Sequence, residues 1–126
     1  MIATQLRPQI TFRDMTSSEA VTSHVERRAQ KLKLLFDRVV GCHVVVEEPH
    51  RHSTKGKKFH VRINLHVPGK ELIISKNPEM AKEDLHVAID DAFTDAERVL
   101  EEHARKVRER DRGAHRGEPT NEPDVR

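Results

Sequence analysis

The chain has 126 residues, with 23 Lys and Arg against 21 Asp and Glu and a formal net charge of +2. A length of this order predicts a single domain. Hydrophobic and charged residues each make up 35%, so the core must be small and confined to strongly patterned elements. The absence of Trp and Tyr argues against a single-strand binder that stacks bases on aromatic side chains. One Cys allows no internal disulfide, and no apolar run suits a membrane span or a signal peptide. We therefore expect a cytoplasmic protein without a membrane partner.

The first half of the chain predicts a strand, a helix and a second strand. Residues 9–13 form a short extended stretch that places Ile10 and Phe12 on one face. Thr16 and Glu19 have the spacing of a capping box, so a helix is expected from about Ser17 to Leu35. The apolar stripe of this helix consists of Val21, Val25, Ala29, Leu32 and Phe36. Residues 39–48 are rich in β-branched side chains and predict a strand whose inward face carries Val40, Cys42, Val44 and Val46.

The second half predicts a hairpin and a long helix. Residues 59–67 alternate apolar and polar side chains, and residues 70–76 return after the turn dipeptide Pro68-Gly69. Residues 50–57 and 77–79 read as connecting loops. From Asp84 to Arg112 apolar residues recur every three or four positions, which indicates one amphipathic helix. Its acidic first part and basic last part suit the helix dipole. Residues 113–126 are polar and aperiodic, and they predict a disordered tail after a domain of residues 1–112.

This order of elements, β-α-β-β-β-α, predicts an α+β fold. Two amphipathic helices on one face of a four-stranded, mainly antiparallel sheet would form a two-layer sandwich. The second face of the sheet would be polar and would meet water or a partner. It would carry His43, Val45, Glu47, His60, Arg62, Asn64, His66 and Glu71.

No arrangement of residues indicates catalysis, and we predict neither enzyme activity, nor a cofactor, nor a small-molecule substrate. The sequence lacks the common nucleophile, phosphate-loop, dinucleotide and zinc-protease motifs. Cys42 and His43 are adjacent in a strand and point to opposite faces, so Cys42 is expected to be a buried apolar residue. The acidic pair Asp90-Asp91 suits a solvated helix face better than acid-base chemistry. The histidines lie among Lys and Arg side chains, which disfavours a divalent metal ion, and no metal site is predicted.

The basic residues of the two helices are the remaining signal. If the helices lie side by side, these residues could form one positive surface that neutralises phosphates and releases counterions. The candidate RNA-binding residues are Arg27, Arg28, Lys31, Arg98, Arg105, Lys106 and Arg108.

Several strings, in their order and spacing, resemble one known family. They are HVERRAQKLKLLFDRV, CHVVVEEP, FHVRINLHVPGKELIIS and EDLHVAIDDAFTDAERVL, within about residues 9–110. The chain resembles the ribosome hibernation-promoting factor and ribosome-associated inhibitor A family, also called the sigma-54 modulation or S30EA family, in its short form. The resemblance implies binding to the 30S subunit and its 16S rRNA, in the channel of messenger and transfer RNA, and inhibition of translation. It implies RNA contacts by the basic residues of both helices.

Two functions remain open at this point. Asp95 and Glu102 stand where this family commonly carries Lys, and His86 stands where Tyr is frequent. The alternative to a ribosome-binding inhibitor is therefore a protein-interaction module with the same fold that has lost strong RNA binding. Its partner would use the polar sheet face or the acidic part of the last helix. The sequence specifies no oligomeric state.

Overall fold

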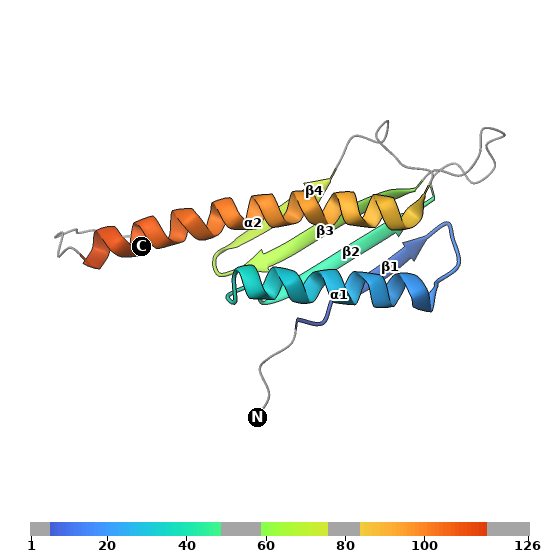
Figure 1. Cartoon of the computed structure of the whole chain (residues 1–126), viewed down its shortest axis with the longest axis horizontal. Coiled ribbons are helices and arrows are strands. Elements are labelled where there is room, and N and C mark those ends of the chain that lie inside the picture. The colour runs from blue at the N-terminus through green and yellow to red at the C-terminus, as the bar shows by residue number, and fades with distance from the viewer. Residues whose placement is uncertain (1–5, 49–58, 76–83, 116–126) are drawn as a thin grey trace, which may run out of the picture.

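The computed structural model describes residues 6–48, 59–75 and 84–115, with side chains as far as residue 112. Six elements follow one another along the chain (Figure 1). They are β1 (Gln9–Arg13), α1 (Glu19–Leu35), β2 (Gly41–Glu47), β3 (His60–Val67), β4 (Lys70–Ser75) and α2 (Leu85–His115). The order matches the prediction. The predicted loops at residues 50–57 and 77–79 lie outside the described residues.

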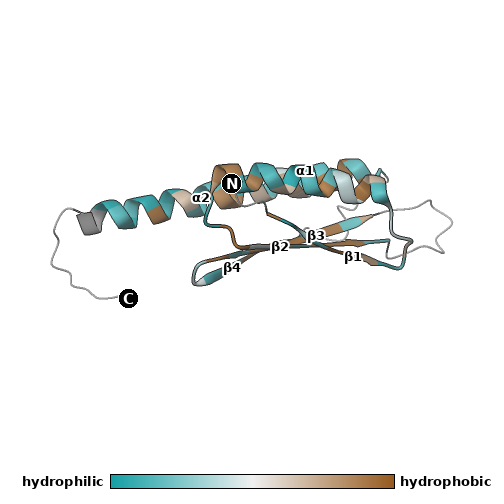
Figure 2. Ribbon diagram, turned by 90° about the horizontal axis from the view of Figure 1, so that it is seen from below, coloured by the Kyte–Doolittle hydropathy of each residue, from teal (hydrophilic) through white to brown (hydrophobic). Residues whose placement is uncertain are grey.

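The strands form one sheet in the order β1-β2-β3-β4. β1 pairs with β2 in parallel, whereas β2 with β3 and β3 with β4 are antiparallel. Both helices cover the same face of the sheet, and no described helix covers the other face (Figure 2). The predicted two-layer α+β sandwich is confirmed. In Figure 1, α2 runs well beyond the end of α1 and of the sheet.

The core lies between the helices and the sheet because each element presents one apolar face to the same layer. Alternate residues of β3 are buried, as a half-covered strand requires. Cys42 of β2 lies opposite Leu65 of β3, and both are buried in the core. α2 closes the layer with Ile89, Phe93 and Leu100, which are fully buried. Burying a side chain of this size stabilises the fold by about 1.5–3 kcal/mol.

The start of α1 differs from the prediction. The N-cap is Ser18 rather than Thr16, and the helix begins at Glu19. Ser18 has an extended backbone (φ −142°, ψ 129°), and its Oγ accepts a hydrogen bond of 3.3 Å from the backbone N–H of Val21. Glu19 is then the first helical residue, so it cannot reach back from the third position as a capping box requires. Thr16, Ser17 and Ser18 all carry a hydroxyl group that could cap the helix, and the capping-box spacing alone predicted the wrong one.

The start of β2 also differs from the prediction. Val40 was expected in the core, but it is 72% exposed, whereas Val39 is fully buried. The backbone N–H of Val39 binds the carbonyl of Phe36 in the turn that follows α1, and that of Val40 binds the carbonyl of His66. The regular alternation begins only at Gly41, and the residues before it follow the geometry of the turn.

The hairpin and α2 are formed by local chemistry. Gly69 has φ +76°, a left-handed conformation that glycine adopts without a Cβ penalty, and the hairpin closes directly after it. At the start of α2, Oδ1 of Asp84 accepts hydrogen bonds from the N–H groups of His86 and Val87. α2 continues to His115, three residues past its predicted end, and residues 116–126 lie outside the described structure. None of the described helices has the length and apolarity needed to cross a membrane.

Candidate nucleic-acid interface

Arg28 joins the two helices. It projects from α1 and donates hydrogen bonds to Asp90 at 2.5 Å and to Glu97 at 3.1 Å, both on α2. Its guanidinium carbon lies 5.6 Å from the centroid of the Phe93 ring. The side chain is 20% exposed, and Glu97 is 17% exposed. Arg28 was predicted as an RNA contact, but in this arrangement its charge is already matched by two carboxylates.

Two histidines extend this contact towards the start of α2. Nε2 of His24 lies 2.8 Å from Oδ1 of Asp90, and the rings of His24 and His86 stack with centroids 4.8 Å apart. Burial alone would raise the pKa of the Asp90 carboxyl, but hydrogen bonds and positive charge from His24 and Arg28 outweigh it, and the pKa is lowered. Asp90 thus keeps the exposure that was predicted, at 50%, but it also has partners on α1 that were not predicted. Its partners Arg28 and His24 lie 62 and 66 residues away in the sequence, so no local sequence pattern could predict these contacts.

Four other predicted contacts also have carboxylate partners. Nζ of Lys31 lies 3.6 Å from Glu97, and Arg98 lies 2.9 Å from Asp95. The remaining pairs join Arg105 to Glu102 at 3.9 Å and to Glu109 at 3.5 Å, and Lys106 to Glu102 at 3.8 Å. The basic members of these pairs are more than half exposed. Exposed ion pairs contribute about 0–1 kcal/mol, so these cations can exchange a carboxylate for a phosphate at low cost.

The end of α1 and the facing part of α2 form a hollow of about 520 Å³. Its lining consists of Leu35, Arg98, Glu101, Glu102, Ala104, Arg105 and Arg108. Three of the seven predicted contacts, Arg98, Arg105 and Arg108, therefore meet at one place. Lys106 does not line this hollow. It precedes Arg108 by two positions, and side chains two positions apart on a helix point about 200° away from each other around the axis.

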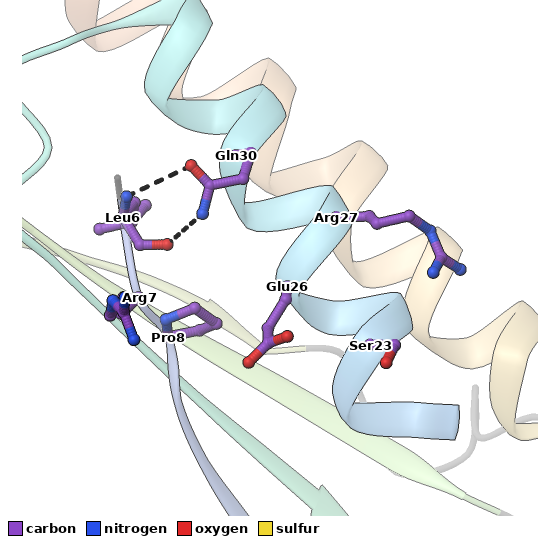
Figure 3. A pocket seen from close by; sticks show the side chains of 7 residues that line it. All are labelled: Leu6, Arg7, Pro8, Ser23, Glu26, Arg27 and Gln30. Carbon is purple, nitrogen blue, oxygen red and sulfur yellow. Dashed lines mark hydrogen bonds between the residues drawn. The ribbon is translucent and has the colours of Figure 1, made fainter. Parts of the chain in front are cut away.

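Arg27 lies at a second hollow, of about 420 Å³, where the N-terminal segment passes α1 (Figure 3). The amide of Gln30 holds that segment in place. It donates to the carbonyl of Leu6 at 2.5 Å and accepts from the Leu6 N–H at 3.3 Å. Figure 3 shows the Arg27 side chain directed away from Leu6. Among the described residues, no ion pair involves Arg27 or Arg108, which are the two least neutralised of the predicted contacts.

Cys42 and His43 of β2 point to opposite faces of the sheet, as predicted. Cys42 is buried, and burial raises the pKa of its thiol to about 12. His43 points to the other face, where Nε2 lies 2.9 Å from Oγ1 of Thr11. That open face carries the expected polar side chains but also Ile73, which is 61% exposed and was not anticipated. Within the described residues no cluster of His, Cys, Asp and Glu could hold a metal ion.

The fold and the helix surface together define a small α+β protein that presents arginines beside one end of a helix pair. The profile of the family described as Sigma 54 modulation protein / S30EA ribosomal protein matches residues 9–108. The chain belongs to this family of ribosome-associated proteins, which confirms the resemblance seen in the sequence. No curated protein matches the chain in sequence.

Solved structures share the fold. The crystal structure of the Thermus thermophilus Protein Y N-terminal domain has a TM-score of 0.62 and 20% identity, over 79% of this chain and 99% of that one. A ribosomal subunit interface protein from Coxiella burnetii has a TM-score of 0.60 and 18% identity, over 77% of this chain and 96% of that one. At these identities the likeness concerns the fold.

Proposed function

We propose that this protein is a translation inhibitor and hibernation factor that binds small-subunit rRNA in the channel of messenger and transfer RNA. Family membership and the subunit-interface protein of the same fold support the ribosome as partner. The observation that carries the proposal for this chain is the meeting of Arg98, Arg105 and Arg108 at one hollow between the helices. Occupation of the channel would exclude the other RNAs by volume, so no catalytic group is needed.

The contacts would be to phosphates. Arg27 and Arg108 would bind without giving up a carboxylate partner, whereas Arg98 and Arg105 would exchange theirs. Such contacts read the shape and backbone of folded RNA rather than its base sequence. Each neutralised phosphate releases counterions, so affinity should fall steeply as salt rises.

Arg28 is unsuited to testing this proposal by mutation. A charge reversal there would place three carboxylates together at the helix interface, since Asp90 and Glu97 already contact that position. If such a variant failed to bind the ribosome, the cause could be disruption of the fold rather than loss of an RNA contact. The informative residues are Arg27 and Arg108, because their substitution breaks no ion pair within the described residues.

The test compares two double variants by sedimentation with purified ribosomes at several salt concentrations. Arg27→Gln with Arg108→Gln removes two charges from the helix surface. Arg13→Gln with Arg62→Gln removes two exposed charges from strands of the sheet and is the matched control. We expect the helix variant to bind more weakly, with a log-log salt slope smaller by about 1.5, and the control to match the wild type.

Absence of the wild-type protein from the 30S and 70S fractions at every salt concentration would refute the proposal. Wild-type binding that only the sheet variant weakens would instead favour the protein-interaction alternative. In that case the open face, with its exposed Ile73, would be the contact surface.

A further inference from the structure

A second group of basic side chains lies on the other flank of α2, around His103. Lys106 and Arg110 follow His103 at three and seven positions, so the three side chains share one helix face. Lys70 joins them from another element, as the first residue of β4 after the hairpin turn. In Figures 1 and 2 this turn lies beneath the middle of α2. The half-buried His103 ring packs edge-on against Phe36, with centroids 5.4 Å apart.

Carboxylates close in sequence to this group are engaged elsewhere. Glu71 follows Lys70, but its Oε2 accepts a hydrogen bond of 2.9 Å from Asn64 on the open sheet face. Asp111 follows Arg110 and lies 3.6 Å from Arg38. Glu102 contacts the group directly, 3.8 Å from Lys106, and it also pairs with Arg105.

The basic side chains of Lys70, His103, Lys106 and Arg110 therefore outnumber the carboxylate that is described in contact with them, that of Glu102. Burial lowers the pKa of the His103 imidazole, and the charges of Lys70, Arg110 and Lys106 lower it further. Like charges held together from two elements repel one another, and an anion placed among them would relieve that repulsion. Lys ammonium and Arg guanidinium groups are the usual protein partners of phosphate.

We propose that Lys70, His103, Lys106 and Arg110 form a second phosphate site for the RNA backbone. This inference rests on the proposed function and adds a contact outside the helix-helix surface. With Arg105 and Arg108 on one flank of α2 and this group on the other, the projecting end of α2 would lie between two stretches of RNA backbone. RNA is favoured over an acidic protein because the four side chains offer charge without the apolar anchors on which protein interfaces depend.

The first experiment follows the His103 ring by NMR during titration with a short double-stranded RNA, with the signal assigned from His103→Gln. RNA should shift the pKa of His103 upward in the wild type, because a nearby phosphate favours the imidazolium form. Lys70→Gln with Arg110→Gln should lose most of that shift. An unchanged His103 pKa at saturating RNA overturns the site. So does a larger upward shift with polyglutamate than with RNA at equal charge concentration.

The second experiment measures ribosome binding of Lys70→Gln with Arg110→Gln against salt. Neither residue has a described ion pair, and a urea unfolding midpoint equal to that of the wild type would establish that the variant is folded. We expect about tenfold weaker binding and a salt slope smaller by about 1.5. Wild-type affinity and slope in this variant would overturn the second site while leaving the proposed function standing. Absence of ribosome binding by the wild type would instead remove the proposed function itself.

Discussion

Arg28 on α1 and Asp90 on α2 share a hydrogen bond of 2.5 Å across 62 residues of chain. The same guanidinium also reaches Glu97, so one side chain of α1 holds two successive regions of α2. This contact lies between α1 and α2, the two helices that form the proposed RNA surface. It therefore fixes the distance between the basic residues of α1 and those of α2. Residues that sequence reasoning assigned to RNA binding and to solvent thus cooperate in positioning that surface.

Replacing Arg28 should destabilise the fold. Arg28→Ala leaves Glu97, which is 17% exposed, with Lys31 as its remaining described partner. Loss of one partner from a partly buried ionic contact costs about 1–3 kcal/mol. Urea unfolding measures the difference. The control is Arg98→Ala, because Arg98 is 71% exposed and should cost less than about 0.5 kcal/mol. Equal effects of the two substitutions would contradict a structural role for Arg28.

The contribution of Asp90 to stability should depend on pH. Its pKa is lower in the folded protein than the ordinary value, so the folded state favours the ionised carboxyl. The stabilisation is complete above the pKa of the unfolded chain, about 3.9, and is lost as pH falls through the folded pKa. Asp90→Asn should therefore be less stable than the wild type at pH 7, with the difference shrinking at pH 3. A difference that stays constant between these two pH values would show that ionisation is not the cause.

Cys42 should be unreactive in the folded protein. Burial raises the pKa of its thiol to about 12, so almost no thiolate exists at pH 8. Iodoacetamide should label the chain slowly in buffer and rapidly in urea, as mass spectrometry would record. Labelling in buffer at the rate seen in urea would mean that β2 opens readily or that the thiol is accessible.

Gly69 should resist substitution because of its backbone rather than its surroundings. A Cβ there would meet nothing within 4 Å, but φ is +76°. Gly69→Ala should cost about 1 kcal/mol through left-handed strain alone. Gly69→Asn should cost less, since Asn tolerates this conformation better. Thermal unfolding of the two variants provides the comparison, and an alanine variant as stable as the asparagine variant would count against this explanation.

The order of elements could be read from the sequence because it depends on local chemistry. The alternation of residues 59–67 and the apolar stripe of residues 85–107 each satisfy a geometry within one segment. The burial of Cys42 followed in the same way from its place in an apolar strand. The sequence prediction was wrong where several neighbouring residues could cap the same helix, as with Ser18 and Thr16. It was also wrong at Val40, where a turn precedes the regular in-and-out alternation of the strand.

The partners of the charged side chains, in contrast, were decided by the tertiary structure. The sequence assigned Arg28 to RNA binding and Asp90 to a solvated helix face, and only the packing of α1 against α2 makes them partners. Lys70 and His103 are 33 positions apart in the sequence, and only the passage of α2 beside the hairpin turn brings them together. The sequence by itself determined which helix faces are apolar and which carry basic residues. Packing determined which basic residues join the two helices and which stay mostly exposed, because electrostatic partners are set by distance in space.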